Sequence, residues 1–189
     1  MTTAVVIRGV GLVILLVLGF MIVARGLTPS AGGVLAFVHM IDLVFHEAGH
    51  VMFGFFGQFL GILGGSLNQV LIPVVCTGHF LWHDRTAAAA VTLFWTGESL
   101  ADVAIYVADG RDMALPLLAE GLIHDWNWIL SELSLRNQAV PIGRAVFALA
   151  VMVLVAAIGL LAVELVRRLN EPPSGGVLFS ERSDDKTTP

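Results

Sequence analysis

Long apolar runs dominate this sequence and limit what it can fold into. Five of them lie at about 9–24, 33–56, 59–82, 86–108 and 145–166. A helix of about 20 apolar residues crosses the hydrocarbon core of a bilayer. The chain is 57% hydrophobic and only 13% charged, which is too few polar residues to cover a water-soluble domain. The runs therefore predict an all-α, polytopic transmembrane helical bundle of about five spans in a lipid bilayer.

The two ends of the chain differ in character. The first run lies between Arg8 and Arg25, and residues 4–7 lengthen it to about 20 residues if the Arg8 side chain reaches the membrane surface. It lacks the small-residue pattern of a signal-peptide cleavage site, so we expect an uncleaved anchor. From residue 170 the sequence is polar and contains Pro and Gly, which predicts a disordered tail. We therefore expect a membrane domain at 1–169 and a tail at 170–189.

Charge and cysteine content argue against several classes of protein. Ten basic and 15 acidic residues give a net charge of −5, and the basic residues are scattered, so nucleic-acid binding is not expected. The single cysteine, Cys76, excludes a disulfide scaffold. If the arginine-containing end of the last run is cytoplasmic, five alternating spans place Arg25 inside and Arg8 outside, in weak agreement with the positive-inside rule.

The second run contains the sequence HEAGH at residues 46–50, an H-E-x-x-H motif. Residues four apart share one face of a helix, so His46 and His50 can bind one metal ion while Glu47 lies about 100° round the helix. Zinc bound by two imidazoles and a carboxylate keeps a position for water, and a neighbouring glutamate can accept the proton of that water. Such polar groups are costly inside a span and usually functional. We predict a Zn²⁺ site with Glu47 as the general base.

The motif resembles the signature helix of the site-2 protease family of intramembrane zinc metalloproteases, which carries HExGH. The resemblance implies an enzyme, a zinc-dependent metallopeptidase that cuts a membrane-spanning protein substrate, and we expect it in a bacterial inner membrane. It also implies a third zinc ligand from an Asp-Gly pair on a later span, which Asp109 and Gly110 match. The longer N-P-D-G form of that pair is absent here.

The residues themselves leave the third ligand open. Glu98, Asp102 and Asp109 share one face of the fourth run, because they are spaced by four and seven. Depth in the membrane favours Asp102 and the motif favours Asp109, so we expect one of the two to bind the metal. His124 and Asp125, in the loop on the same side, are a competing source.

Three further sets of polar residues have predicted roles near these groups. Asp42, one turn before the motif, could orient His46 as a hydrogen-bond acceptor. Asn68 and Gln69 lie in the third run at a depth where they could bind the backbone of an unwound substrate, although they could equally hold helices together. His79 and His83 lie at the opposite end of that run, where an interfacial role is expected.

Two other functions remain open. A membrane metal-binding or transport protein would use the acidic and imidazole face as a cation pathway. A non-catalytic membrane subunit would use the same face only to hold its spans together. Replacing Glu47 with glutamine and measuring the metal content distinguish these functions from proteolysis.

Overall fold

The computed structural model describes residues 3–29, 32–116 and 123–170. Its helices, in chain order, are α1 (Thr3–Arg25), α2 (Gly33–Gly54), α3 (Gln58–Trp82), α4 (Thr86–Asp109), α5 (Asp125–Glu132), the 3₁₀ helix η1 (Arg136–Gln138) and α6 (Ala139–Asn170). Within these residues, five segments are long and apolar enough to cross a membrane: α1, α2, α3, α4, and η1 together with α6. The predicted all-α fold with about five apolar spans is confirmed. The predicted tail lies outside the described residues, apart from Asn170 at the end of α6.

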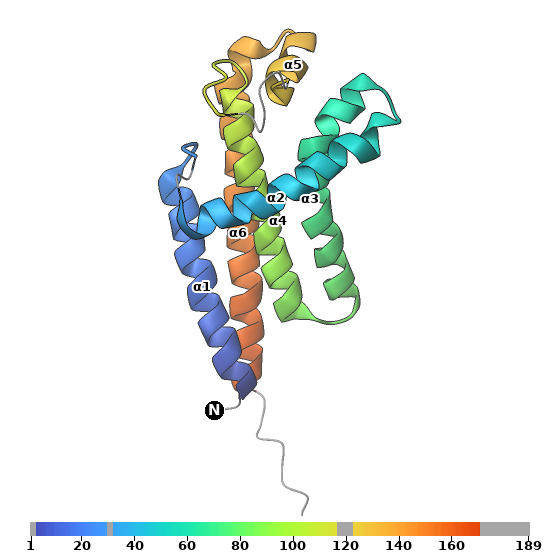
Figure 1. Cartoon of the computed structure of the whole chain (residues 1–189). Helices are drawn as coiled ribbons and strands as arrows, with labels where there is room; N and C mark the ends of the chain where they lie inside the picture. The colour runs from blue at the N-terminus through green and yellow to red at the C-terminus, as the bar shows by residue number, and fades with distance from the viewer. Residues whose placement is uncertain (1–2, 30–31, 117–122, 171–189) are drawn as a thin grey trace, which may run out of the picture.

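The long helices do not simply alternate in direction. Helices α1, α4 and α6 lie side by side, and α2 lies across them (Figure 1). The N-terminal end of α1 therefore meets the C-terminal end of α6, where Arg8 Nε lies 3.3 Å from Glu164 Oε1 and Arg168 Nε donates to the same oxygen at 2.9 Å. Placing Arg8 and Arg168 on opposite sides of the membrane was wrong, because α2 does not reverse the direction of the chain.

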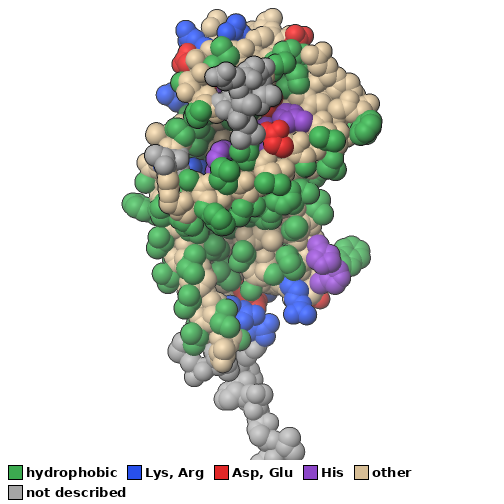
Figure 2. Space-filling model, viewed as in Figure 1, with side chains coloured by type: hydrophobic (Ala, Val, Ile, Leu, Met, Phe, Trp, Pro, Cys, Tyr) green, Lys and Arg blue, Asp and Glu red, His purple; other side chains and the backbone are tan. Residues whose placement is uncertain are grey.

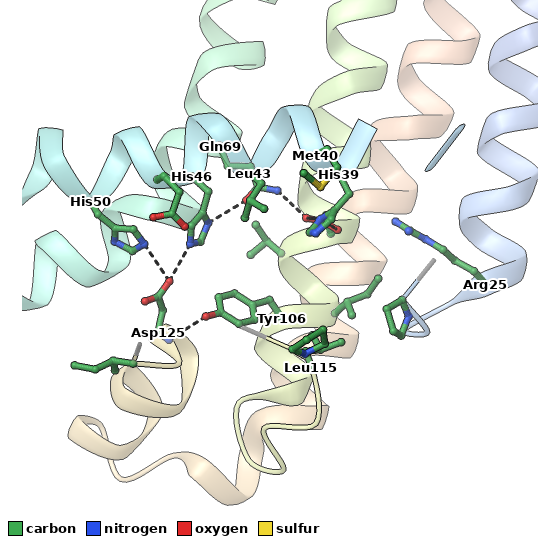
Figure 3. Close-up of a pocket in the computed structure, with 17 residues that line it drawn as sticks. Arg25, His39, Met40, Leu43, His46, His50, Gln69, Tyr106, Leu115 and Asp125 are labelled. Atoms are coloured by element: carbon green, nitrogen blue, oxygen red, sulfur yellow. Dashed lines mark hydrogen bonds and ion pairs between the residues drawn. The ribbon is translucent and has the colours of Figure 1, made fainter. Parts of the chain in front are cut away.

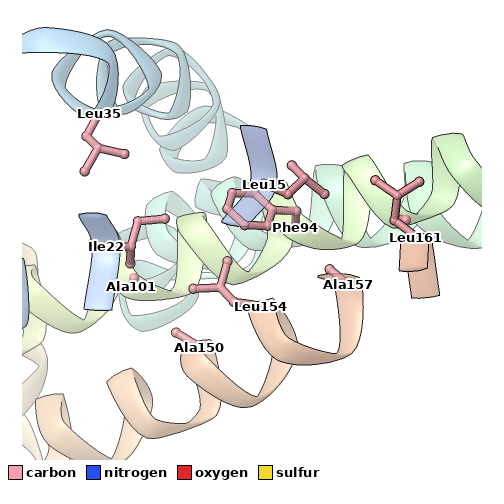
Figure 4. Packing of buried hydrophobic residues seen from close by; sticks show 10 residues of the cluster. Leu15, Ile22, Leu35, Phe94, Ala101, Ala150, Leu154, Ala157 and Leu161 are labelled. Atoms are coloured by element: carbon pink, nitrogen blue, oxygen red, sulfur yellow. The ribbon is translucent and has the colours of Figure 1, made fainter. Parts of the chain in front are cut away.

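Small residues bring α4 and α6 into close contact. A Cβ atom added to Gly97 would lie 2.8 Å from Leu154 Cγ, and one added to Gly143 would lie 2.7 Å from Ala108 Cβ. The apolar cluster around this contact also takes in α1 and part of α2 (Figure 4), with buried members Leu15, Ile22, Leu35, Ala90, Phe94, Ala101, Ala150, Leu154, Ala157 and Leu161. Close backbone approach of this kind is a common basis for helix association in membranes.

Helix α3 bends, and each half has a different neighbour (Figure 1). Its first half packs on α2, where a Cβ on Gly64 would lie 2.7 Å from the Gly49 carbonyl oxygen. Its second half lies beside α4, and Thr77 Oγ1 donates to Thr92 Oγ1 at 3.0 Å. Pro73 lies inside the helix and has no N–H to donate to the carbonyl of Gln69. Because of the bend, the first half of α3 packs on α2 while its second half packs on α4.

The outer surface has the apolar character of a membrane protein. Figure 2 shows hydrophobic side chains over much of the middle of the molecule, with Lys and Arg side chains toward its top and bottom. Large apolar side chains such as Ile7, Phe20 and Val155 are 64%, 73% and 64% exposed. A water-soluble domain of this size does not expose so much contiguous apolar surface. The protein is therefore an integral membrane protein whose helices contact lipid.

The last span begins earlier than the hydropathy predicts. The apolar run suggested about 145–166, whereas α6 covers Ala139–Asn170. Pro141 lies in the first turn of α6, where its missing N–H would have no partner within the helix. A short helix, α5, precedes this span.

Candidate metal centre

Two imidazoles and one carboxylate converge between α2 and α5. His46 Nε2 lies 2.9 Å from Asp125 Oδ2, and His50 Nε2 lies 3.3 Å from the same oxygen. Figure 3 shows both rings pointing from α2 toward Asp125, the first residue of α5. One possible ligand atom from each residue lies within 4.8 Å of the others. His46 and Asp125 are buried, with 6% and 7% of their surface exposed.

The chemistry of this group fits a divalent metal ion. Zinc bonds of about 2.0–2.2 Å in a tetrahedral arrangement place neighbouring ligand atoms about 3.4 Å apart. The two separations of 2.9 and 3.3 Å are close to that value, and all three ligand atoms lie within 4.8 Å of one another. Two imidazoles and a carboxylate are also the donor set of many catalytic zinc sites, which keep a fourth position for water or substrate. The protein is therefore a helical membrane protein with a buried His-His-Asp group that could hold a metal.

Glycines in α2 and α3 make room for the imidazoles. A Cβ atom on Gly65 would lie 2.6 Å from His46 Nε2 and 2.7 Å from His50 Nε2. A Cβ on Gly49 would collide with the Gly64 carbonyl oxygen. The glycines therefore allow close contact between α2 and α3. Gly65 in particular leaves the space that the two ring nitrogens occupy.

Both imidazoles have an oxygen acceptor at Nδ1. His46 Nδ1 lies 3.2 Å from the side-chain oxygen of Gln69, and His50 Nδ1 lies 2.9 Å from the main-chain oxygen of Gly61. An acceptor at Nδ1 lets the neutral ring keep its proton there and offer the Nε2 lone pair to a metal, whereas without a metal Nε2 carries a proton and donates it to Asp125. The two Nε2 atoms are the ones that face Asp125.

Helix α5 is held in place by contacts with α3 and α4. The main-chain N–H of Asp125 donates to Tyr106 Oη of α4 at 3.1 Å, and Trp126 Nε1 donates to Ser66 Oγ of α3 at 3.0 Å. These bonds fix the start of α5 beside the HEAGH helix.

Asp109, predicted as a ligand from the Asp-Gly pair, has another set of partners. It accepts hydrogen bonds from the main-chain N–H groups of Ala114 and Leu115 at 2.9 and 3.1 Å, and from His124 Nε2 at 3.0 Å. His124 in turn accepts from the Asn127 N–H at 3.2 Å and so caps α5. Asp109 thus supports the loop and the helix start that carry Asp125, and His124 supports them too.

Asp102, the other predicted ligand, lies on the far side of Gln69 from His46. It accepts from Gln69 Nε2 at 3.0 Å and lies 2.9 Å from His39 Nδ1. Neither Asp102 nor Asp109 belongs to the group that surrounds the two imidazoles in the described part of the chain. The carboxylate that does belong to it, Asp125, was weighed in the sequence only as part of a competing loop pair. The sequence gives little indication that Asp125 is the ligand, because no spacing rule connects a loop residue with a helix 75 or more residues away.

The remaining predicted polar residues contact neighbouring helices. Asn68 Nδ2 donates to the Phe45 main-chain oxygen at 2.7 Å, as expected of a residue that holds helices together. Asp42 accepts hydrogen bonds from Trp95 Nε1 at 2.7 Å and from Ser99 Oγ at 3.3 Å, so it faces α4. The acceptor at His46 Nδ1 is Gln69 and not Asp42. Substrate binding by Asn68 and Gln69 stays a prediction.

His79 and His83 lie far along α3 from the centre, in agreement with their predicted separation from it. Their ring centroids are 4.3 Å apart, and His83 Nδ1 donates to the His79 main-chain oxygen at 2.8 Å. Within the described residues, the pair is not part of a group of three metal-binding side chains.

A cavity of about 970 Å³ opens beside the metal centre. His46, His50, Asp125 and Glu47 line it together with apolar side chains, among them Met40, Leu43, Ile105, Leu115 and Ile123 (Figure 3). Glu47 is exposed. Its carboxylate therefore faces the same space as the two imidazoles and is accessible to water or to a bound molecule.

The carboxylate of Asp125 is held in its charged form. Burial opposes ionisation, but the hydrogen bonds from His46 and His50 outweigh it, and the pKa of Asp125 is lowered from its ordinary value. Asp125 is therefore an anion at neutral pH, which is the form that binds a metal cation.

The chain matches no protein-family model, and neither the curated proteins nor the solved structures give a match. The function must therefore be inferred from the chemistry of the site itself.

Proposed function

We propose that this protein is an intramembrane zinc metalloprotease that hydrolyses peptide bonds of membrane-embedded protein substrates. One observation carries the proposal. His46, His50 and Asp125 converge on a common point, and Glu47 lines the same cavity. This combination of a metal-binding group and an accessible carboxylate on one helix matches the needs of metal-assisted hydrolysis.

In this mechanism the three converging residues would hold a zinc ion through two Nε2 atoms and a carboxylate oxygen. A zinc ion bound there would polarise a carbonyl group and lower the pKa of water to about 7. Glu47 accepts a proton from the attacking water on its carboxylate and returns it to the leaving amide nitrogen. The Nδ1 acceptors Gln69 and Gly61 hold the two rings in the orientation that this geometry requires.

The cavity favours an apolar polypeptide as the substrate. Its apolar lining suits the side chains of a transmembrane segment, and its volume of about 970 Å³ is large enough for several residues in an extended conformation. A substrate helix must unwind before its backbone can be cleaved, and its free N–H and C=O groups then need partners away from water. The polar side chains around the metal centre would supply some of these partners.

A transport function has one observation in its favour. Polar groups continue from the metal centre into the bundle through Gln69, Asp102 and His39, which are joined by hydrogen bonds of 2.9–3.2 Å. A cation pathway would use such groups in sequence. A transport function does not explain why Glu47 lies beside the two metal-binding histidines, whereas proteolysis requires a base at that position.

Replacing the proposed base tests the function directly. The Glu47→Gln variant should retain near-stoichiometric zinc and lose cleavage of single-span membrane proteins in proteoliposomes by about 10²–10⁴-fold, the usual contribution of a general base. Glu132→Gln, at the exposed end of α5, is the matched control and should cleave normally. Unchanged cleavage in Glu47→Gln would contradict the assigned role of this residue. A wild-type protein that moves zinc across the vesicle membrane and cleaves no substrate would favour transport.

A further inference from the structure

A line of hydrogen bonds leads from the metal centre to a carboxylate that does not bind the metal. His46 Nδ1 lies 3.2 Å from Gln69 Oε1, and Gln69 Nε2 donates to Asp102 Oδ2 at 3.0 Å. His39 Nδ1 also lies within hydrogen-bond distance of both Asp102 carboxylate oxygens, at 3.0 Å from Oδ1 and 2.9 Å from Oδ2. Gln69 is 3% exposed, so water does not compete freely for its amide. The amide of Gln69 therefore has two protein partners with different chemical demands.

The carboxylate of Asp102 determines which way the Gln69 amide points. An ionised carboxylate can only accept hydrogen bonds, so it must face the NH₂ group of Gln69. The carbonyl oxygen of Gln69 then faces His46 Nδ1, which must carry the ring proton in order to donate to it. With the proton on Nδ1, the Nε2 lone pair can bind a metal beside Asp125, in place of the hydrogen bond that Nε2 donates to Asp125 when no metal is bound.

The opposite orientation of the amide would disable the ligand. If Gln69 turned its NH₂ group toward His46, Nδ1 would have to accept and the ring proton would move to Nε2. The carbonyl oxygen of Gln69 would then face the Asp102 carboxylate, leaving two buried acceptors opposed to one another. The tautomer of His50 does not depend on a side chain, because its Nδ1 faces the main-chain oxygen of Gly61, which can only accept a hydrogen bond. Only His46 depends on a side chain for its tautomer.

We propose that Gln69 and Asp102 are positioning residues of the metal centre, and that together they hold His46 in the tautomer whose Nε2 binds the metal. The proposal rests on the metal centre of the proposed function and is independent of whether the bound metal serves proteolysis. Asp102 does not contact His46 and acts on it through the amide of Gln69. His39, whose side chain is 46% exposed at the cavity, supplies the second donor to Asp102.

A single substitution and its rescue test this arrangement. Asp102→Asn can offer its own NH₂ group to Gln69 and so allows the amide to turn. The zinc affinity of this variant should fall by about 10–100-fold, as for other outer-shell partners of metal ligands. In the double variant Gln69→Glu with Asp102→Asn, the new carboxylate must accept from both His46 and the new amide. The double variant should recover most of the lost zinc affinity.

The measurement is the zinc dissociation constant of the full chain in detergent, obtained by competition with a chromophoric chelator. ¹⁵N NMR of histidine-labelled, zinc-loaded protein reports the tautomer of His46, which a purely structural effect would not change. Ser99→Ala is the control, because it removes a buried hydrogen bond from α4 without touching Gln69. This control should bind zinc as the wild type does.

Several outcomes would overturn the proposal. They are unchanged zinc affinity in Asp102→Asn, a double variant no better than the single one, or a wild-type protein that binds no zinc. If the double variant does not fold, Gln69→Leu decides the matter, because loss of the acceptor should weaken zinc binding about 10–100-fold. Failure of the proposed proteolysis is a separate result, recognised by a wild type that binds zinc and cleaves nothing.

Discussion

The bundle of α1, α4 and α6 and the pair formed by α2 and the first half of α3 are held together by different chemistry. In the bundle, buried apolar side chains such as Leu154 and Phe94 pack around the glycine and alanine positions of α4 and α6. In the α2–α3 pair, the helices touch through Gly49, Gly64 and Gly65 and are linked by polar side chains. The bundle is held by close apolar packing, whereas the α2–α3 pair is linked by hydrogen bonds around two imidazoles.

The difference teaches how stability and function are divided in this molecule. Polar groups in a membrane gain little over their alternatives, because an unfolded span also finds partners for them. Close apolar packing depends on volume and is lost when a buried side chain is shortened. We therefore expect changes in the bundle to alter stability with the metal centre intact, and changes in the α2–α3 pair to alter metal binding with the fold intact.

The largest expected effect is on the bundle. Leu154→Ala removes a side chain that is 2% exposed and packs on Gly97, so it should destabilise the fold by about 2–5 kcal/mol. Thermal unfolding in detergent measures the loss, and zinc content per folded molecule should stay at the wild-type level. Leu149→Ala, on the lipid-facing side of α6 at 46% exposure, is the control and should change stability much less. Loss of zinc in folded Leu154→Ala would break the division between the two regions.

The next effect is on the metal centre itself. Asp125→Asn removes the anionic ligand while keeping the main-chain bond to Tyr106, so zinc affinity should fall by more than the roughly 10–100-fold typical of outer-shell partners. Chelator competition measures the affinity, and the unfolding temperature of the metal-free protein should change little. Asp112→Asn, an exposed loop carboxylate beside Arg111, should bind zinc normally. Complete loss of zinc in Asp102→Asn or Asp109→Asn would instead support that residue as the ligand.

The smallest effect concerns the space for the imidazoles. Gly65→Ala places a Cβ atom within 2.6–2.7 Å of the ring atoms of His46 and His50, and these side-chain ends can move more easily than backbone. Overpacking of about 1–3 kcal/mol should therefore appear as a roughly 5–150-fold loss of zinc affinity with the fold retained. Gly78→Ala, on the same helix with nothing within 4 Å of the added Cβ, is the matched control. An unfolded Gly65→Ala protein would show that this contact belongs to the scaffold.

Local features of the fold could be predicted well from the sequence. The expected start of the second span at residue 33 and of the fourth at residue 86 agree with α2 and α4. Spacing by four placed His46 and His50 on one face, and the structure brings both rings to one carboxylate. Hydropathy and helical spacing depend on neighbouring residues, which is why they identified spans and the pair of imidazoles. The start of α6 was missed because Pro141 is tolerated in a first helical turn.

The amino-acid sequence by itself determined that this is a helical membrane protein and that one helix presents two imidazoles and a glutamate. Both follow from local periodicity and composition. Only the tertiary structure decided that α2 lies across the bundle, that Asp125 completes the group, and that Gln69 joins His46 to Asp102. These features depend on contacts between residues far apart in the chain, such as the 79 positions between His46 and Asp125, and no short-range pattern encodes such contacts.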